Sequence, residues 1–427
     1  MDALISAAFS ALVKVGRLEV ITAKGSRLLF GDGSGIHTTV RFRDAGAERA
    51  LLLNPELKTG ELFTDGRLTV EQGTVYDFLL MAMQGAREAS EPWVLRLADE
   101  ARVAATRVFA RNDPRRAARN VAHHYDLGDD LYALFLDPDW QYSCAYFEHP
   151  DQSLVDAQLA KKRHVAAKLL IEPGNSVLDI GSGWGGLALH LAELCGADRV
   201  LGVTLSTEQI ERARRRAIEH GLAERVTFQL QDYRQLAGRF DRIVSVGMFE
   251  HVGLAFYGEF FRAVRRLLAD DGVALIHTIA SPDTPGPTNP WIRKYIFPGG
   301  HIPSLSDIAP HLEKAGLVLT DLETLGPHYA LTLQAWRRNF MSRRDEAKRM
   351  FDERFCRMWE FYLSLSEAAF RTDDITVFQL QLARRRGAVP LTRSYMEERE
   401  RLLRGREPHV QNPREADPAP GSDPLPG

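Results

Sequence analysis

The segment that most constrains the fold of this chain is 177–186, which has the sequence VLDIGSGWGG. It predicts an apolar strand that ends in an acid, a glycine-rich turn, and then a helix over 187–194. Glycines adopt positive φ angles and let a ligand approach the backbone, and the first N–H groups of the following helix point at the same place. Three interpretations are open for such a turn: a dinucleotide site, a site for another nucleoside ligand, and a plain connection between a strand and a helix.

The glycine spacing and the residues downstream bear on the two ligand-binding interpretations. Gly181, Gly183 and Gly186 fit the dinucleotide pattern G-x-G-x-x-G. The Leu-Asp pair before the turn and the closely spaced glycines favour instead the loop that holds S-adenosylmethionine (SAM) in methyltransferases. A dinucleotide site also needs an acid about 20 residues further on, and the next predicted strand is followed by Thr204 rather than by an acid. Thr204, together with Gln209 on the next helix, can bind ribose hydroxyls without one.

From residue 177 onward, predicted strands and helices alternate. This alternation is typical of an α/β fold, in which a mostly parallel sheet carries helices on both faces and ligands bind beyond the carboxyl ends of the strands. We therefore expect a Rossmann-like sheet of the class I SAM-methyltransferase type. The predicted strands are 177–180, 200–203, 226–230, 242–246 and 273–278, and the predicted helices are 187–194, 207–220 and 257–268.

Length and composition limit the class of protein. A chain of 427 residues is long enough for two domains, and a net charge of −3 gives no overall attraction to nucleic acid. The three cysteines are far apart in the sequence, so neither a disulfide framework nor a metal site is predicted. The sequence has no signal-peptide pattern and no apolar stretch of membrane-spanning length. These features favour a cytoplasmic protein that meets a membrane only at its surface.

The first 100 residues differ from the predicted sheet. Residues 1–100 are expected to form a small α+β domain, because 17–21 and 38–42 alternate polar with apolar residues and 75–83 has a helical pattern. The catalytic domain is assigned to 121–403.

Two further segments connect or follow these domains. Residues 101–120 hold six arginines against a single acid. This pattern is consistent with a solvated helical linker or with electrostatic binding to anionic lipid headgroups. The tail, 404–427, is rich in proline and is expected to be disordered.

Polar side chains are expected along the carboxyl edge of the sheet. Asp232 and Tyr233 follow the third predicted strand and suit the amino group and ring of adenine. Glu250 follows the fourth strand, and His277 lies at the end of the fifth. Because parallel strands bring their carboxyl ends to one edge, Glu250 and His277 should lie close to a methyl donor. Singly, each has a plainer explanation, since a histidine at a strand end is often scaffold and a glutamate that opens a helix is often a cap.

Taken together, these motifs closely resemble those of the cyclopropane-fatty-acyl-phospholipid synthases. The resemblance runs from about residue 10 to about residue 400 and includes the small N-terminal domain. Thr204, which stands where most enzymes of this class have an acid, is part of the resemblance. The motifs that carry the resemblance are 123–130 (HHYDLGDD), 142–147 (YSCAYF), 177–186, 202–206 (GVTLS), 246–253 (VGMFEHVG), 275–279 (LIHTI) and 290–300 (PWIRKYIFPGG).

The resemblance implies a transfer of a methylene group from SAM to the cis double bond of an unsaturated fatty acyl chain in a membrane phospholipid. The carbocation formed on the chain must be shielded from water until a base removes a proton and the cyclopropane ring closes. Family enzymes are thought to use a bound bicarbonate ion as that base. The resemblance gives its ligands as Cys144, Glu250, His277, Ile279 and Tyr329, with backbone groups making the contact at Cys144 and Ile279.

The resemblance also implies which residues surround the two substrates. The segment 283–291 is expected to form a loop over the site. The N-terminal domain is expected to bind lipid and to form a homodimer, and the protein is expected to work at the inner membrane surface. Six aromatic rings are candidates to line the acyl tunnel and stabilise its cation, although packing in the apolar core is the commoner role for any one of them: Tyr146, Phe147, Phe249, Tyr295, Phe297 and Tyr329. The implied SAM-binding residues are Tyr142, Ser143, Asp179, Gly181, Gly183, Thr204, Leu205, Gln209, Asp232 and Tyr233.

Two alternatives to ring formation remain at this stage. One is a sister enzyme on the same fold that produces methyl- or methylene-branched acyl chains, or methylates another acceptor such as an amine. Ring and branch differ only in the fate of one carbocation. The other alternative is a lipid-binding protein that has lost catalysis, and the presence of Glu250, His277 and Tyr329 argues against it.

Overall fold

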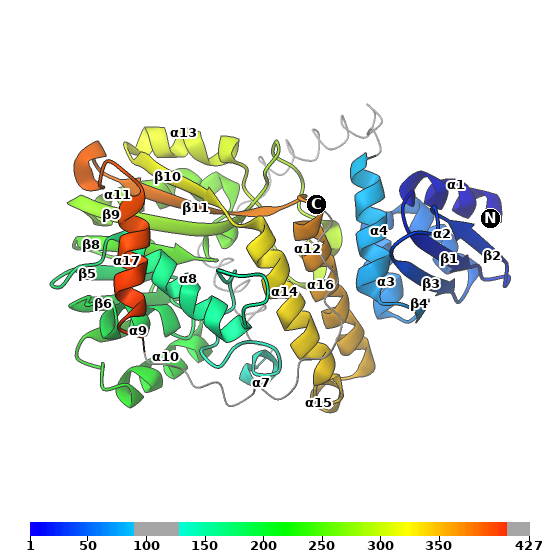
Figure 1. The fold of residues 1–427 in the computed structure, drawn as a ribbon, viewed down its shortest axis with the longest axis horizontal. Coiled ribbons are helices and arrows are strands. Elements are labelled where there is room, and N and C mark those ends of the chain that lie inside the picture. The colour runs from blue at the N-terminus through cyan, green and yellow to red at the C-terminus, as the bar shows by residue number, and fades with distance from the viewer. Residues whose placement is uncertain (89–127, 408–427) are drawn as a thin grey trace.

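A computed structural model describes residues 1–88 and 128–407 (Figure 1). The described chain forms a small N-terminal α+β unit and a larger α/β unit that holds a seven-stranded sheet. The basic segment 101–120 and most of the proline-rich tail lie outside the described residues.

The large sheet has the strand order β10-β11-β9-β8-β5-β6-β7. Its strands pair in parallel from β9 through β7, whereas β11 pairs antiparallel with both of its neighbours. A parallel sheet with one reversed strand near an edge confirms the predicted fold class. The strands are β5 (Ser176–Ile180), β6 (Arg199–Thr204), β7 (Val226–Leu230), β8 (Phe240–Val246), β9 (Leu268–Ala280), β10 (Val318–Thr324) and β11 (Thr376–Ala383).

Alternation along the central strands sends neighbouring side chains to opposite faces of the sheet. Val177 belongs to the core under α8, α9 and α10, whereas Leu178 belongs to the core under α11 and α13. Val244 and Ile243 on β8 divide in the same way. A further helix, α17, packs against the outside of α8. These helices are α8 (Leu154–Leu169), α9 (Gly186–Glu193), α10 (Thr207–Glu219), α11 (Tyr257–Leu267), α13 (Leu305–Ala315) and α17 (Ser394–Arg404).

The N-terminal unit is a four-stranded sheet of order β2-β1-β3-β4 with four helices. Its apolar core includes Phe9, Val20, Phe42 and Phe78, each at most 3% exposed. The strands are β1 (Arg17–Ile21), β2 (Arg27–Phe30), β3 (His37–Phe42) and β4 (Leu68–Gln72). The helices are α1 (Asp2–Leu12), α2 (Ala45–Leu53), α3 (Pro55–Thr64) and α4 (Val75–Glu88).

A helical layer joins the two units. Figure 1 shows α14 and α16 between the large sheet and the N-terminal unit, and α16 packs on α14 on one side and on α3 and α4 on the other. Polar contacts reinforce this docking, since Glu61 accepts hydrogen bonds from Lys294 at 2.7 Å and from the Tyr295 hydroxyl at 3.0 Å. The helices on the catalytic side are α12 (Pro290–Tyr295), α14 (Gly326–Ser342), α15 (Arg344–Met350) and α16 (Glu353–Arg371).

The predicted elements match the structure closely where the sequence pattern was regular. Each predicted strand of the large sheet is present, with β9 longer at both ends because its flanks pair with β8 and β11. The sequence analysis made no prediction for β2, β4, β10, β11, α14 or α16. At the C-terminus, Arg404 ends α17 and the carboxylate of Glu407 pairs with Arg163, so the described chain is ordered a few residues past the start of the predicted tail.

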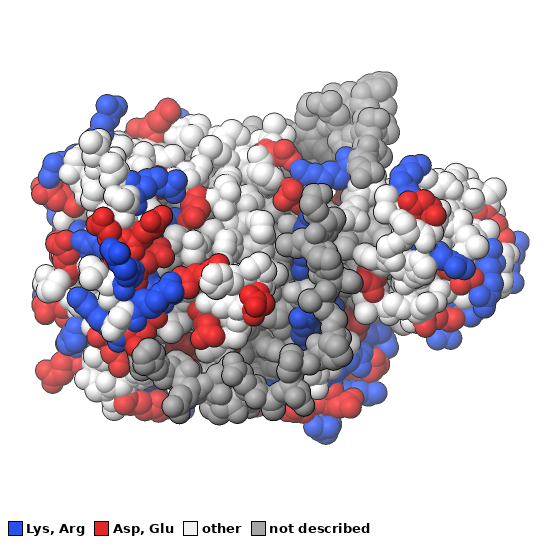
Figure 2. Space-filling view, viewed as in Figure 1, with Lys and Arg blue, Asp and Glu red and all other residues white. Residues whose placement is uncertain are grey.

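Charged side chains of both signs are interspersed over the face that carries α17 (Figure 2). Many are paired there, for example Arg404 with Glu148 and Arg399 with Glu172. Such mixing agrees with the small net charge of −3. No helix in the described part of the chain is long and apolar enough to cross a membrane.

Gly60 is the point of closest approach between the two units, and it gives a test of their docking. A Cβ at this position would lie 2.5 Å from the Trp291 ring and 2.7 Å from the Phe361 ring. We expect Gly60→Val to cost about 1–3 kcal/mol of docking free energy and to increase the radius of gyration in small-angle X-ray scattering. Gly405→Val is the control, because a Cβ there meets only ordinary contacts at 3.5 Å or more. An unchanged radius for Gly60→Val would mean that α3 does not dock as described.

Candidate active site

A cavity of about 150 Å³ lies beyond the carboxyl ends of β5, β6, β7 and β8. This is the edge where the strand order predicts a ligand. All ten residues that the sequence analysis assigned to SAM line it. They are Tyr142, Ser143, Asp179, Gly181, Gly183, Thr204, Leu205, Gln209, Asp232 and Tyr233.

The glycine-rich turn forms the floor of this first cavity. Gly181, Gly183 and Gly185 all have positive φ angles, of 83°, 53° and 84°. A Cβ on Gly181 would lie 2.7 Å from the Met248 side chain, and one on Gly186 would lie 2.3 Å from the Gln141 amide nitrogen. Only glycine therefore allows the turn to pass so close to its neighbours. The first N–H groups of α9 follow directly, as a nucleoside ligand requires.

The polar groups expected for ribose and adenine lie on the far wall of the first cavity. Thr204 donates its hydroxyl hydrogen to Gln209 Oε1 at 2.9 Å, and both side chains are buried. The two residues that replace the missing acid are thus held together. Asp232 accepts hydrogen bonds from the Arg234 guanidinium at 2.9 and 3.1 Å. Its Oδ1 also accepts the Arg234 backbone N–H at 2.9 Å and its Oδ2 accepts from Arg234 Nη2 at 2.5 Å, so Arg234 holds this carboxylate at the cavity wall.

Asp179 is the next-to-last residue of β5 and is almost completely buried, at 2% exposure. Its Oδ2 has no hydrogen-bond partner in the described structure. Burial raises the pKa of Asp179 to about 7, and the charge of Lys161 opposes that shift. An unsatisfied buried carboxylate oxygen at a cavity wall is a natural site for a ligand donor.

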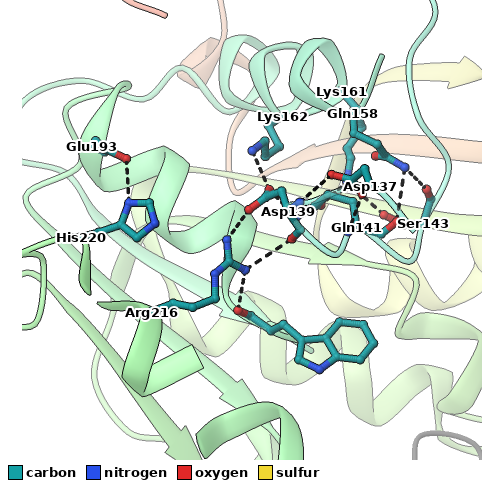
Figure 3. Close-up of polar contacts among 11 residues, drawn as sticks. Asp137, Asp139, Gln141, Ser143, Gln158, Lys161, Lys162, Glu193, Arg216 and His220 are labelled. Atoms are coloured by element: carbon teal, nitrogen blue, oxygen red, sulfur yellow. Dashed lines mark hydrogen bonds and ion pairs between the residues drawn. The ribbon is translucent and has the colours of Figure 1, made fainter. Parts of the chain in front are cut away.

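The loop that carries Tyr142 and Ser143 into the cavity is fixed by α8 and α10 (Figure 3). Gln158 donates to the Ser143 carbonyl at 2.9 Å, and Lys161 donates to the Ser143 hydroxyl at 3.0 Å. Lys162 pairs with Asp139 at 2.6 Å, and Arg216 binds the same carboxylate from α10. The loop is therefore held by buried charged and amide groups rather than by apolar packing alone.

A second cavity, of about 770 Å³, lies between the catalytic and N-terminal units. The five residues that the sequence analysis assigned to bicarbonate, Cys144, Glu250, His277, Ile279 and Tyr329, all line it. Its other wall is apolar and comes from α1, α2 and α4, including Phe9, Leu51, Phe78 and Met83.

The two cavities share part of their walls. Tyr142, Ser143, Gly247 and His251 line both of them. The Tyr142 hydroxyl is hydrogen-bonded to the Tyr362 hydroxyl at 2.8 Å, which ties this shared wall to α16. Burial lowers the pKa of His251 to about 4, so its imidazole is neutral at pH 7. A ligand in one cavity can thus lie next to a ligand in the other.

The tautomer of His277 follows from its buried neighbours. Lys168 donates to Gln379 Oε1 at 2.9 Å, and because an ammonium group can only donate, the Gln379 amide nitrogen must face His277. That nitrogen lies 3.1 Å from His277 Nδ1, which therefore accepts. Burial lowers the pKa of His277 to about 3, so the ring is neutral and its hydrogen is on Nε2. His277 is thus prepared as a donor to an acceptor in the second cavity.

Glu250 has one satisfied and one unsatisfied oxygen. Its Oε1 accepts the Ile279 backbone N–H at 2.6 Å, whereas Oε2 is buried without a partner in the described structure. Burial raises the pKa of Glu250 to about 7, against the effect of the Ile279 hydrogen bond. Both the protonated and the charged form are therefore accessible near neutral pH.

Cys144 and Tyr329 complete the wall of the second cavity. The Cys144 thiol is 1% exposed and donates to the Ala145 carbonyl at 3.2 Å. Burial raises the pKa of this thiol well above its usual value, so it is not a nucleophile at neutral pH. The Tyr329 ring packs against Phe370, with ring centroids 4.6 Å apart.

The aromatic set that was expected to line the acyl tunnel is largely wrong. Only Phe297 and Tyr329 line the second cavity. Tyr146 is instead stacked between His164 and His328, and Phe249 is fully buried among the rings of α11. The Phe147 ring packs in a small apolar cluster, and the Tyr295 hydroxyl binds Glu61. The rings that do line the cavity are Phe9, Phe78, Tyr142, Phe297, Tyr329, Phe361, Tyr362 and Phe370.

Other residues of the site were not predicted from the sequence. Lys161 lines the first cavity from α8, and Gln379 reaches His277 from β11. The other site residues were predicted because they lie at the carboxyl ends of parallel strands. Lys161 lies on a helix and Gln379 on the antiparallel strand, so this signal does not find them. The predicted loop 283–291 contributes Gly286, Pro287, Thr288 and Asn289 to the second cavity, and its last two residues begin α12. No group of three or more metal-binding side chains occurs within residues 1–88 and 128–407.

Comparison with known proteins shows the family to which the chain belongs. A profile of the mycolic acid cyclopropane synthetase family matches residues 112–380. The chain belongs to this family. It is 40% identical over 345 residues to the cyclopropane-fatty-acyl-phospholipid synthase of Escherichia coli K12, an alignment that covers 81% of this chain and 87% of the relative. It is also 41% identical over 282 residues to the tuberculostearic acid methyltransferase of Mycobacterium tuberculosis, covering 63% of this chain and 66% of that protein.

Solved structures of the family agree with the fold. A cyclopropane synthase from Mycobacterium tuberculosis matches with a TM-score of 0.59 and 35% identity, covering 62% of this chain and 98% of that one. A mycolic acid cyclopropane synthase complexed with S-adenosylhomocysteine (SAH) and CTAB matches with the same TM-score and identity, covering 62% of this chain and 97% of that one. These matches identify the chain as a SAM-dependent methyltransferase.

The hydrogen-bond chain behind His277 gives a test of its tautomer. Replacing Gln379 with Leu removes the donor to Nδ1, so we expect His277 to change from a single Nε2–H tautomer to a mixture. Nitrogen-15 NMR of histidine-labelled protein measures this directly from the ring-nitrogen shifts. Gln381→Leu is the matched control, because Gln381 is a buried amide on the same strand that binds the Lys168 carbonyl and Tyr395 but not His277. A mixed tautomer in the wild type would contradict the assignment.

Proposed function

We propose that this protein transfers a methylene group from SAM to the cis double bond of an unsaturated fatty acyl chain in a membrane phospholipid and so forms a cyclopropane ring. The observation that carries the proposal is the contact between the two cavities at Tyr142, Ser143, Gly247 and His251. One cavity has the glycine-rich floor and polar walls that suit SAM, and the other has the volume and apolar lining that suit an acyl chain. The E. coli relative named above supports the choice of substrate.

The residues present fit SAM in the first cavity. The turn at Gly181–Gly183–Gly185 leaves room for a ligand near the backbone, and Asp179 offers an oxygen that no protein group uses. When bound, SAM supplies an electrophilic methyl group. The chain would hold that group beside the second cavity through the fixed loop at Tyr142 and Ser143. This arrangement lowers the barrier by orientation rather than by a reactive side chain.

The apolar wall of the second cavity suits the carbocation formed on the acyl chain. Phe297, Tyr329 and Phe370 present rings to the cavity, and ring faces attract positive charge. The walls from α1, α2 and α4 would keep water away from the cation until it loses a proton. We propose lipid binding as the role of the N-terminal unit on this ground.

We propose that a bicarbonate ion, as the base for ring closure, binds between the polar groups of the second cavity. His277 offers an Nε2–H donor, and Glu250 Oε2 has no partner in the described structure and can accept from a bicarbonate hydroxyl. Tyr329 would add a hydroxyl. The Ile279 N–H already donates to Glu250, so Ile279 would act by fixing that carboxylate. The Cys144 thiol is held by a carbonyl, which leaves only its backbone for the ion.

The substrate implies a location for the reaction. We propose that the protein works as a peripheral protein at the cytoplasmic membrane surface, where a phospholipid acyl chain can enter the second cavity beside the N-terminal unit. A homodimer formed through that unit is part of the same proposal and remains a prediction. Size-exclusion chromatography with light scattering measures the oligomeric state.

A second candidate is methylation of the acyl chain without ring closure. It is favoured by the 41% identity to the tuberculostearic acid methyltransferase. Both reactions would use the same cavities, and they differ in the fate of the cation. In ring closure the added carbon bonds to the cationic carbon as its proton leaves, whereas a 1,2-hydride shift followed by loss of a proton leaves a methylene branch. Both outcomes need a base, so the polar groups near His277 and Glu250 would serve either, and the alignment with the E. coli relative over 81% of this chain favours ring closure.

The product separates the two candidates. We expect cells that lack their own cyclopropane synthase and express this chain to accumulate fatty acids heavier by one methylene group. Gas chromatography with mass spectrometry of the methyl esters, before and after mild hydrogenation, measures the product. A cyclopropane ester keeps its retention time and mass after mild hydrogenation, because it has no double bond to reduce. A methylene branch is converted to a methyl branch. A branched product would replace the first candidate by the second, and no new lipid would refute both.

Removal of the proposed base gives a second test. In purified enzyme with unsaturated phospholipid vesicles, we expect carbon-dioxide-free buffer to lower kcat and added bicarbonate to restore it. His277→Ala should lower kcat by about 100- to 10,000-fold, the range for loss of a general base or its support. SAH affinity, measured by calorimetry, should change by less than about threefold, because His277 does not line the first cavity. Equal losses of rate and SAH affinity would contradict the assigned role.

A further inference from the structure

Lys161 places a buried ammonium group at the wall of the first cavity. The residue lies on α8, is 1% exposed, and lines that cavity. Its Nζ donates to Gln141 Oε1 and to the Ser143 hydroxyl, and both acceptors are uncharged. Because an ammonium group carries three hydrogens, one remains for another acceptor.

The charge of Lys161 has no matching carboxylate in contact. Within residues 1–88 and 128–407, no ion pair is formed by Lys161, whereas Lys162 pairs with Asp139 and Lys168 pairs with Glu323. Burial lowers the pKa of Lys161 to about 8, with Asp137 and Asp139 opposing the shift. The group is still mainly protonated at pH 7. Burying a cation without a counter-ion is costly, and a ligand carboxylate bound to Lys161 would offset that cost.

Asp179 places a buried carboxyl group at the wall of the same cavity. It is 2% exposed, and its Oδ2 has no hydrogen-bond partner among the described residues. Lys161 and Asp179 influence each other electrostatically without forming an ion pair. The first cavity therefore offers one cationic donor and one carboxylate oxygen, and neither is satisfied by the other.

This pair of groups is complementary to an α-amino acid, which carries an ammonium and a carboxylate on the same carbon. We propose that Lys161 binds the carboxylate of the amino-acid end of SAM, while Asp179 accepts from its α-ammonium group. Lys161 is then a specificity-determining residue, because it distinguishes ligands that keep the carboxylate from those that lack it. Gln141 and the Ser143 hydroxyl hold its ammonium group in position (Figure 3).

The experiment combines a change in the protein with a change in the ligand. Calorimetry measures the affinity of the full chain for SAH and for decarboxylated SAH, which keeps the ammonium group and loses the carboxylate. In the wild type, loss of the ligand carboxylate should weaken binding by about 10- to 100-fold, the range for a hydrogen bond to a charged group. In Lys161→Met the same ligand change should cost less than about threefold, because the partner of the carboxylate is gone.

Lys162→Met is the matched control. It removes a cation from the adjacent position of α8 and a contact to the same loop, since Lys162 binds Asp139. If Lys161 only supported the loop, both variants would weaken the two ligands equally and keep the wild-type preference. We expect Lys162→Met to keep that preference and Lys161→Met to lose it. Lys161→Gln serves as a second variant that retains a polar side chain.

The wild-type measurement keeps the inference testable even if both Lys161 variants fail to fold. A wild-type preference of less than about threefold for SAH over its decarboxylated form would overturn it. The inference rests on the part of the proposed function that assigns SAM to the first cavity, and it does not depend on the lipid product. Tight SAH binding with the expected preference but without any new lipid would refute the proposed function and leave the assignment of Lys161 standing.

Discussion

The buried polar face of α8 is the constraint on which the rest of the site depends. Lys161, Lys162, Arg163, His164 and Lys168 are each at most 8% exposed, although they occupy a single helix. Burying so many charges is favourable only if each has a partner of the right geometry. Those partners come from separate parts of the chain, so α8 fixes their relative positions.

The buried charges of α8 bind several separate parts of the enzyme. Lys161 and Lys162 bind the loop that leads to Ser143, and Lys168 orients Gln379 behind His277. His164 lies between two carboxylates, Glu323 on β10 at 2.7 Å and Glu400 on α17 at 2.6 Å. These carboxylates raise the pKa of His164 above its usual value despite its burial. The wall of the first cavity, His277 and the C-terminal helix are thus positioned by one element.

The sequence predicts the lining of the first cavity well, because the topology of the parallel sheet fixes where these residues lie. Residues that follow parallel strands must meet at one edge, so Asp179, Thr204, Asp232 and Glu250 could be placed without knowing any distance. The basic residues of α8 could not be placed in the same way, since a run of lysine and arginine usually marks a solvated helix face. Phe249 was named as a candidate ring of the acyl tunnel and instead belongs to the apolar core, which is where an aromatic residue beside a site more often lies. The lining of the second cavity depends on how the N-terminal unit docks, which no local pattern indicates.

The wall shared by the two cavities has a thermodynamic consequence. Tyr142 and Ser143 face both cavities, and the same short segment is anchored to α16 by the Tyr142–Tyr362 hydrogen bond. A ligand in either cavity contacts this same segment, so occupancy of the two cavities should be linked. Linkage between equilibrium affinities is reciprocal. If an acyl chain tightens the hold on SAM by some factor, SAM must tighten the hold on the acyl chain by that factor, and methyl donor left without lipid would be bound less firmly.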